Sequence, residues 1–482
     1  MKLISLCSPI LVLVLLGALC APVSAGAAPD FAALDAYLEQ QRAAAHVPGL
    51  AIGVVQGGEI VHLQGYGVTG PSGQAVTPQT NFILGSVTKG VTALAVMQLV
   101  EAGQVDLEAP VDEYLPWFGL SDVTVRHLLN QTSGISTRTG RLWMTDTYRE
   151  QDAIARHAQK MSAQPRTRPA GDVYEYSNAN YVILGALIEA VSGQTYEQYL
   201  AAHIFEPLAM RRTYAHELEA EVDGMSSGYV QWLGAPLRLH APYPAGDVPA
   251  GYLVTNAEDM AHYLVAQMNG GAYDGQQVLS AAGVQTLHTG AAPSSAVTKY
   301  AMGWEVGTHQ GLVVIDHRGD VANYHTNIIL LPEHELGLVL LANANSTVHG
   351  ERINQIAWDA ARLLAGLKPL PLEPEPMIRV VIGFVAAVVL ATLVLIGLSV
   401  RTLRRRAAGR KTSRVGAAAL VLLLALIAAL TLIGMPAMFG APIPVMLLFS
   451  PDLGWPAIGA GVLAGVGALL LVGLLAVRPR AA

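Results

Sequence analysis

The sequence predicts an α/β fold of the α+β kind, in which an antiparallel sheet built from both ends of one domain lies beside a helical subdomain and precedes three membrane-spanning helices. Strand-like runs occur near both ends of the region 29–366, whereas its middle, residues 86–199, has mainly helical periodicity. Uninterrupted apolar runs follow at about 380–400, 416–435 and 457–477. The hydrophobic fraction of 52% against 13% charged residues is too apolar for an ordinary soluble protein.

The domain at 29–366 is expected to begin with a helix over residues 31–45, because its apolar residues recur at helical spacing. Two strands follow, at 49–55 and 59–65, separated by a Gly-Gly turn. Three later strands and a closing helix are expected over residues 311–315, 327–331, 336–341 and 350–364. Strands at both ends flanking a helical middle predict one antiparallel sheet with a helical insertion beside it, and a functional site in the cleft between them.

Residues 1–28 have the layout of a secretory signal peptide, with Lys2, the apolar run 10–19 and then small residues. A lipoprotein signal ending at Cys20 is the alternative, but the bulky leucine before that cysteine disfavours it. Cys7 and Cys20 are the only cysteines of the chain and both lie in this segment. The mature protein is therefore expected to contain no cysteine, which excludes thiol catalysis and thiolate metal sites.

The membrane topology follows from the distribution of basic residues. Seven of them lie between the first and second apolar runs: Arg401, Arg404, Arg405, Arg406, Arg410, Lys411 and Arg414. The positive-inside rule places that loop in the cytoplasm, so the domain before it is extracytoplasmic, in agreement with the signal peptide. The proline-rich residues 367–378 are interpreted as a tether to the transmembrane region 379–477. Residues 436–456, which contain five prolines, are expected to form an outer loop against the bilayer, with a re-entrant segment as the alternative.

The charge pattern also limits the partners. The formal net charge is −7, and the only basic cluster is the loop that membrane topology explains. We therefore expect a multi-pass protein of the cell membrane whose macromolecular partner is the lipid bilayer, with no binding of nucleic acid.

The first chemical motif is Ser86-Val87-Thr88-Lys89, at the head of the apolar stretch 88–100. Residues three apart share a helix face, so Lys89 can take the proton of Ser86 and activate it as a nucleophile. Burial in such a helix would disfavour the charged amine, which suits a proton acceptor. The bland alternative is that Ser86 is an N-cap and Lys89 a solvated helix residue.

The second motif, Tyr176-Ser177-Asn178, leads into the apolar helix expected over residues 182–191. A phenol and an amide two residues apart can face one cleft, where the phenol relays protons and the amide holds a carbonyl. Taken alone, the pattern is more often a turn with a half-buried tyrosine and an asparagine cap.

The third motif is His317-Arg318-Gly319-Asp320, expected just after the strand at 311–315. A glycine on an edge strand lets a substrate backbone approach closely. A tight loop carrying a surface histidine is the commoner explanation of an isolated match.

These three motifs in this order, S-x-x-K, Y-S-N and H-x-G, resemble those of the serine β-lactamase and penicillin-binding protein superfamily, in particular its class C-like and DD-carboxypeptidase branch. The resemblance extends over about residues 31–364 and implies a β-lactamase-like fold. It implies that Ser86 is the acylated nucleophile, Lys89 its proton acceptor and Tyr176 the acid/base relay. It also implies that Asn178 binds the substrate amide, that the backbone N–H groups of Ser86 and Asp320 form the oxyanion hole, and that no metal or organic cofactor is required.

His317, Arg318 and Gly319 would line the substrate cleft, and this motif departs from the Lys-x-Gly pattern of many β-lactamases. A histidine at its first position is more usual of DD-peptidases and of uncharacterised relatives. Arg318 could clamp a substrate carboxylate, although the neighbouring Asp320 would partly cancel its charge.

The expected function is that of a membrane-anchored extracytoplasmic serine hydrolase that forms an acyl-enzyme with a small-molecule or peptide substrate. A D-Ala-D-Ala carboxypeptidase or related cell-wall peptidase is the first expectation. An esterase or a class C-type β-lactamase on the same scaffold is the alternative, because fold does not fix substrate. A non-catalytic penicillin-binding sensor is a third possibility.

Overall fold

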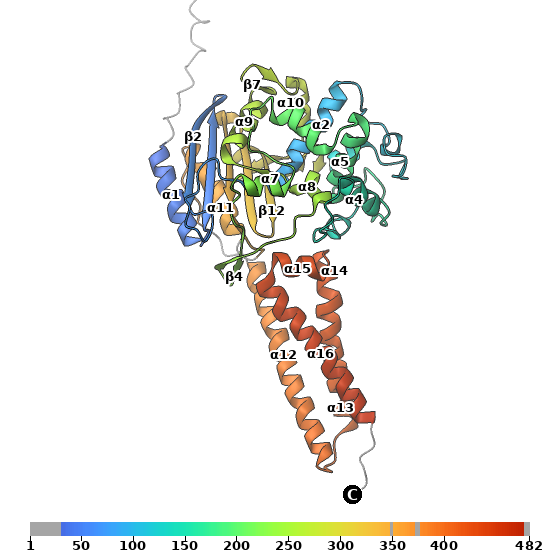
Figure 1. The fold of residues 1–482 in the computed structure, drawn as a ribbon. Helices are drawn as coiled ribbons and strands as arrows, with labels where there is room; N and C mark the ends of the chain where they lie inside the picture. Colours follow the sequence, from blue (N-terminus) through green and yellow to red (C-terminus); the bar gives the residue numbers. More distant parts are fainter. Residues whose placement is uncertain (1–29, 348–349, 372–375, 477–482) are drawn as a thin grey trace, which may run out of the picture.

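An eight-stranded antiparallel sheet organises the region before the apolar helices (Figure 1). The structure, a computed structural model, describes residues 30–347, 350–371 and 376–476. The sheet has the strand order β2-β1-β14-β13-β12-β11-β10-β9. Its strands are β1 (Gly49–Gln56), β2 (Glu59–Gly67), β9 (Ala292–Pro293), β10 (Thr298–Tyr300), β11 (Glu305–His309), β12 (Leu312–Val321), β13 (Tyr324–Leu331) and β14 (Leu336–Ala342). Strands from the two ends of the domain are thus hydrogen-bonded side by side, as predicted.

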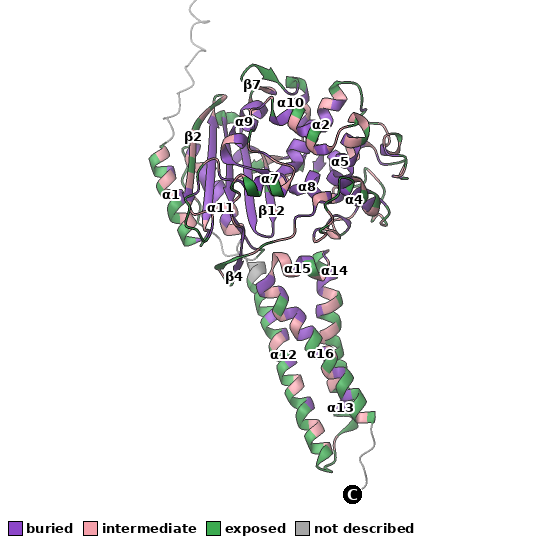
Figure 2. Ribbon diagram, in the orientation of Figure 1, coloured by how far each residue is buried: buried purple, intermediate pink, exposed green. Residues whose placement is uncertain are grey.

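Alternating side chains on the central strands supply two separate cores. Leu338 and Leu340 of β14 pack with α1 (Phe31–Ala44) and α11 (Gly350–Leu364) on one face. Val339 and Leu341 pack into the larger core on the other face, beneath α9 (Ala257–Met268) and the helical subdomain. Figure 2 shows this burial as purple strands between partly exposed outer helices. The domain is therefore a sheet covered by helices on both faces.

The helical subdomain comes from the middle of the chain, as expected, but much of it is turns and irregular structure. Its helices are α2 (Thr88–Glu101), α3 (Val125–Leu129), α4 (Ala153–Ser162), α5 (Asn178–Ser192), α6 (Tyr196–Leu200), α7 (Glu217–Val222), α8 (Val248–Gly251) and α10 (Ala281–Leu287). Short strands outside the main sheet are β3 (Phe82–Ile83), β4 (Tyr229–Trp232), β5 (Ala235–Arg238), β6 (Val254–Thr255), β7 (Ala272–Tyr273), β8 (Gln276–Gln277) and β15 (Ala344–Asn345). The helices α2 and α5 are apolar on nearly all sides because both are buried in the core.

Two expectations about the third motif are wrong. His317 to Asp320 lie inside β12, not in a loop after it, and β12 is not the edge strand, because β11, β10 and β9 extend the sheet beyond it. However, β11 pairs with β12 only from Leu312 to Asp316. The motif residues therefore pair with β13 on one side, and their other edge faces the helical subdomain.

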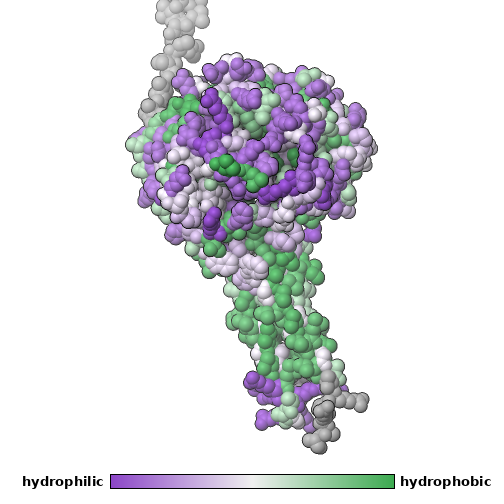
Figure 3. All heavy atoms as spheres, viewed as in Figure 1, coloured by the Kyte–Doolittle hydropathy of each residue, from purple (hydrophilic) through white to green (hydrophobic). Residues whose placement is uncertain are grey.

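Three long apolar helices leave the domain as a shaft, seen in green in Figure 3. They are α12 (Pro376–Ala407), α13 (Arg414–Ala429) with its continuation, and α16 (Pro451–Ala476). Each is long and apolar enough to cross a membrane. The hydrophilic end of the shaft in Figure 3 lies where α12 and α13 are joined, far from the domain. The predicted signal peptide lies outside the described residues, and α12 begins within the predicted tether.

The connection expected over residues 436–456 is largely helical: the chain forms two short helices there, α14 (Met435–Phe439) and α15 (Ile443–Phe449), before α16 begins. A five-residue π-helical turn, Leu430–Gly434, joins α13 to α14 without a break. Pro442 and Pro444 stand at the start of α15, where a missing N–H costs nothing, so they begin that helix instead of preventing it, whereas Pro456 lies inside α16.

These short helices meet the domain at its lower face (Figure 1). Arg141 donates a hydrogen bond of 2.7 Å to the carbonyl oxygen of Phe439, and the hydroxyl of Thr347 donates one of 3.0 Å to that of Phe449. Met144 of the domain packs in the same apolar cluster as Met435 and other side chains of the short helices. Domain and shaft are thus joined by side-chain packing and hydrogen bonds as well as by the covalent link.

Candidate active site

Ser86 lies at the centre of a three-residue contact that unites two of the predicted motifs. Its Oγ is 3.0 Å from Nζ of Lys89 and accepts a hydrogen bond of 2.7 Å from the hydroxyl of Tyr176. Ser86 stands in the 3₁₀ turn Gly85–Val87 that leads into α2, and Lys89 follows one turn later. The local sequence therefore sets the spacing of serine and lysine, while the tyrosine arrives from the start of α5.

Lys89 is fully buried, as its position in an apolar helix predicts. Its Nζ lies 2.9 Å from Oδ1 of Asn178 and close to the carbonyl oxygen of Ala250, at 2.5 Å. Burial lowers the pKa of Lys89 well below its ordinary value of 10.5, and the negative charge of Asp247 opposes this only in part. The bland alternative of a solvated lysine is thereby excluded.

Hydrogen bonds from the loop after α3 fix the backbone at Tyr176. The hydroxyl of Thr137 donates to the carbonyl oxygen of Tyr176 at 2.7 Å, and the next residue, Ser177, donates its N–H to the side chain of Gln131. Burial raises the pKa of the Tyr176 phenol above its ordinary range. The phenol is therefore a proton donor at neutral pH, as its hydrogen bond to Ser86 requires.

Asn178 begins α5 and directs its amide oxygen to Lys89. It lines the same cavity as Ser86 and Tyr176. The second motif is thus assembled around the lysine of the first, and its asparagine is not merely a helix cap.

The third motif meets the first through backbone contact. A Cβ atom on Gly319 would lie 2.2 Å from the carbonyl oxygen of Leu84 and 3.2 Å from the nitrogen of Ser86. Gly85 has φ of +60°, and a Cβ atom there would lie 2.7 Å from the nitrogen of Asp320. Only glycine at both positions permits this approach, which brings the N–H-bearing segments at Ser86 and Asp320 together.

His317 is buried beside the phenol rings of Tyr176 and Tyr300, with ring centroids 6.2 Å and 5.9 Å away. Its Nδ1 lies 2.7 Å from the carbonyl oxygen of Arg318, so this nitrogen carries the proton. Burial lowers the pKa of His317 to about 3. The imidazole is therefore neutral and forms part of the cavity wall.

Arg318 is bound by two carboxylates. Its guanidinium is 2.7 Å from Oδ2 of Asp320 and also forms an ion pair with Glu351 at the start of α11. Burial alone would raise the pKa of Asp320, but the charges of Arg318 and His325 hold it below its ordinary value. A substrate carboxylate would have to displace these internal partners, so the expected clamp is already occupied.

Ser86, Tyr176, Asn178, His317, Arg318 and Asp320 line one cavity of about 830 Å³. Apolar side chains from the shaft form the opposite side of this cavity. We call them the apolar wall: Met435, Phe439, Val445, Met446, Phe449 and Leu453. The predicted cleft between sheet and helical subdomain is therefore closed on one side by the short helices and the start of α16.

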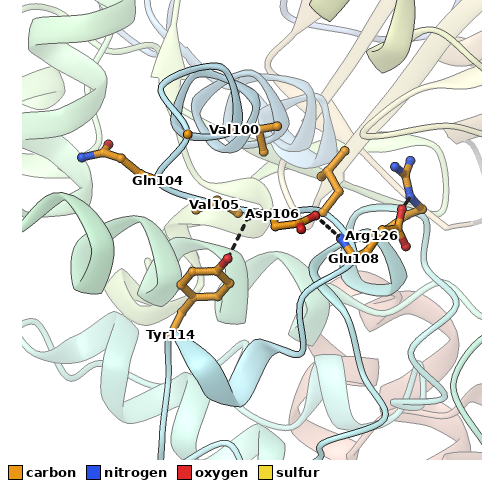
Figure 4. A pocket seen from close by; sticks show the side chains of 9 residues that line it. Val100, Gln104, Val105, Asp106, Glu108, Tyr114 and Arg126 are labelled. Atoms are coloured by element: carbon orange, nitrogen blue, oxygen red, sulfur yellow. Dashed lines mark hydrogen bonds and ion pairs between the residues drawn. The ribbon is translucent and has the colours of Figure 1, made fainter.

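A smaller hollow of about 390 Å³ lies at the C-terminal end of α2 (Figure 4). Its polar groups are bound to one another: the N–H of Asp106 donates to the hydroxyl of Tyr114, and Arg126 forms an ion pair with Glu108. We therefore assign it no chemical role.

Sequence reasoning did not identify several residues of the cavity. Glu351, in the first turn of α11, and Arg141 belong to none of the three motifs. The apolar wall was interpreted as membrane-facing sequence. Only the π-helical turn and the proline positions, which send these segments back under the domain, make them part of the cavity.

The family model named beta-lactamase matches residues 34–362, more than half of the chain. The chain is similar to protein flp of Staphylococcus aureus, with 29% identity, over 65% of this chain and 63% of the length of that relative. It is also similar to penicillin-binding protein 4 of Amycolatopsis lactamdurans, with 29% identity, over 69% of this chain and 91% of that protein.

Among solved structures, the octameric penicillin-binding protein homologue from Pyrococcus abyssi has a TM-score of 0.61 and 29% identity, covering 70% of this chain and 78% of the other. These likenesses confirm the predicted β-lactamase-like fold. The chain spans less than two thirds of the length of protein flp in that match, 63%, and it belongs to the beta-lactamase family.

Proposed function

We propose that this protein is a membrane-anchored extracytoplasmic hydrolase that forms an acyl-enzyme on Ser86 with an ester or amide substrate. The observation that carries the proposal is the position of Ser86 Oγ, which contacts the buried amine of Lys89 at 3.0 Å and the phenol of Tyr176 at 2.7 Å. A hydroxyl with a proton acceptor on one side and a proton donor on the other is prepared for nucleophilic attack.

The hydrogen-bond partners of Lys89 support its role as the base. A neutral amine has two N–H donors and one lone pair. The carbonyl oxygens of Asn178 and Ala250 can only accept, so they take the two N–H donors. The lone pair then faces Ser86, whose hydroxyl proton can pass to it as Oγ forms a bond to the substrate carbonyl carbon.

The position of the Tyr176 phenol supports a role in giving a proton to the leaving group. Once the tetrahedral intermediate forms, the bond from carbon to the leaving group must break and that group must gain a proton. Tyr176 can pass its proton to the leaving group and regain one from the amine of Lys89, which holds the proton taken from Ser86. In deacylation a water molecule replaces the leaving group, and the proton moves in the opposite direction.

The backbone at Ser86 and Asp320 would stabilise the oxyanion. N–H groups fixed by tight backbone packing need no rearrangement when negative charge develops, and a single such donor is worth about 10² to 10³ in rate. The close contact of Gly85 and Gly319 supplies this rigidity.

The substrate class follows from the walls of the cavity. Because Arg318 is bound by Asp320 and Glu351, and because one wall is apolar, we favour an ester or amide with an apolar portion. A peptidase that releases C-terminal D-alanine is the second candidate, and Arg141 is the observation in its favour. Arg141 lines the cavity, and among the described residues it has no carboxylate within ion-pair distance.

The first prediction concerns covalent labelling. A fluorescent penicillin should label the wild-type protein, and Ser86→Ala should abolish the label, because the acyl bond forms on Oγ. Lys89→Ala and Tyr176→Phe should each slow labelling by about 10² or more, the usual scale for a positioned acid or base. Stopped-time labelling followed by gel fluorescence measures this. Absence of label with every β-lactam and fluorophosphonate would contradict the proposal and favour a sensor.

The second prediction concerns pH. Lys89 must be neutral to accept the proton, and burial lowers its pKa, so the labelling rate should rise as pH increases through that lowered pKa and level off well below pH 10.5. The pH at which the rate rises should be the same in His317→Asn, because the pKa of His317 is already about 3. A rate that continues to climb toward 10.5, the ordinary pKa of lysine, would show that Lys89 is not the buried base.

The third prediction tests the oxyanion site. Gly319→Ala should reduce the labelling rate by at least about 10², because the added methyl group forces β12 away from Leu84 and Ser86. Gly251→Ala is the matched control on the other side of the same turn, where a Cβ atom would meet Gly85 at an ordinary 3.6 Å. Equal labelling by both variants, with unchanged thermal unfolding, would remove the proposed role of this contact.

The fourth prediction separates the two substrate candidates. p-Nitrophenyl butyrate should be hydrolysed with a higher kcat/KM than D-alanine is released from a cell-wall pentapeptide. If the peptide is instead preferred, Arg141→Gln should raise KM for the peptide and leave KM for the neutral ester unchanged. KM for both substrates is also measured in Arg318→Gln, which removes the other guanidinium of the cavity.

A further inference from the structure

The cavity at Ser86 has two chemically different sides. The side formed by the domain carries hydroxyl, amide, imidazole and charged groups, and the opposite side is the apolar wall. The segment that supplies most of this wall, residues 435–451, contains no charged residue. A volume of about 830 Å³ lies in the range that holds a whole small ligand, so the cavity has room for more than the group that reacts at Ser86.

The apolar wall is held in place by specific contacts with the domain. The carbonyl oxygen of Phe439 accepts from Arg141, and that of Phe449 accepts from the hydroxyl of Thr347. The N–H of Leu233 in turn donates to the side chain of Asp452 at 3.3 Å. Three separate segments of the domain thus form hydrogen bonds with the short helices and the start of α16. These contacts fix the position of the apolar wall in the cavity.

The apolar wall is also continuous with the surface that would face lipid. Met438, next to Phe439, is 71% exposed on the outside of the shaft, and Trp455, close after Phe449 in the chain, is 57% exposed. Figure 3 shows hydrophobic surface reaching up the shaft to the lower face of the domain. If the shaft spans a bilayer, the apolar side of the cavity lies at the level where hydrocarbon chains end and head groups begin.

We propose that the substrate is a membrane amphiphile, whose ester or amide lies at Ser86 while its hydrocarbon chain lies along the apolar wall. This inference rests on the proposed serine hydrolase and adds the chemical class of its substrate. A hydrocarbon chain can lie against the apolar wall without losing any hydrogen bond. A polar peptide would leave its backbone groups without hydrogen-bond partners there. The bilayer supplies such chains directly beside the cavity.

The test uses the full-length protein in lipid nanodiscs and two series of soluble esters. One series lengthens the acyl side, from p-nitrophenyl acetate to the octanoate, and the other lengthens the alcohol side of acetate esters, from ethyl to octyl. In at least one series kcat/KM should rise by about fourfold per methylene until the wall is covered, since each buried methylene contributes about 0.8 kcal/mol.

Variants locate the effect. Phe439→Ala and Met446→Ala should each lower the ratio of kcat/KM for the longest ester to that for the shortest by about tenfold. Met438→Ala is the matched control, because this neighbour of Phe439 points away from the cavity and should preserve the ratio. Thermal unfolding of each variant identifies any general loss of stability.

Two results would overturn the inference. One is kcat/KM independent of chain length in both series, and the other is an equal rate increase for all esters in Phe439→Ala and Met446→Ala, which would make the wall a lid. Each of these results counts only if penicillin labels the protein and the protein hydrolyses acetate esters. Failure of labelling and of all ester hydrolysis would instead count against the proposed function itself.

Discussion

The burial of one amine, that of Lys89, is the constraint on which the rest of the site depends. Burial disfavours the charged form of Lys89 and lowers its pKa, and the buried amine must find partners for its N–H groups. Asn178 and Ala250 provide them, and each belongs to a different helix. The helices α2, α5 and α8 are therefore brought together around one nitrogen atom, and the same packing turns its lone pair toward Ser86.

The sheet contributes rigidity on the other side of Ser86. β12 approaches the turn before α2 so closely that both Gly85 and Gly319 must lack a side chain. Because β12 is hydrogen-bonded to β13 along the motif, its position is fixed by the central sheet. The nucleophile is thus held between a helical core that supplies the proton acceptor and a strand that supplies backbone donors.

The apolar C-terminal helices change the interpretation of the cavity. In the absence of the shaft, the walls around Ser86 would be largely polar, and the substrate would be sought among soluble peptides. The short helices α14 and α15 add an uncharged side to the same cavity and are bonded to the domain through Arg141 and Thr347. Anchoring and substrate selection can therefore be functions of the same helices.

The sequence by itself determined the elements whose signals are local. Adjacent residues carry the apolar runs of β1 and β14, the apolar helix behind Ser86, the three long apolar runs and the serine-lysine spacing. Only the tertiary structure decided which partners those residues meet. From the sequence, Arg318 was expected to be able to bind a substrate carboxylate, but in the structure it forms an ion pair with Glu351 of α11. The prolines at 442 and 444, expected in a loop, stand at the start of α15, which lines the cavity. These outcomes depend on contacts between distant segments, and no local pattern of residues records such contacts.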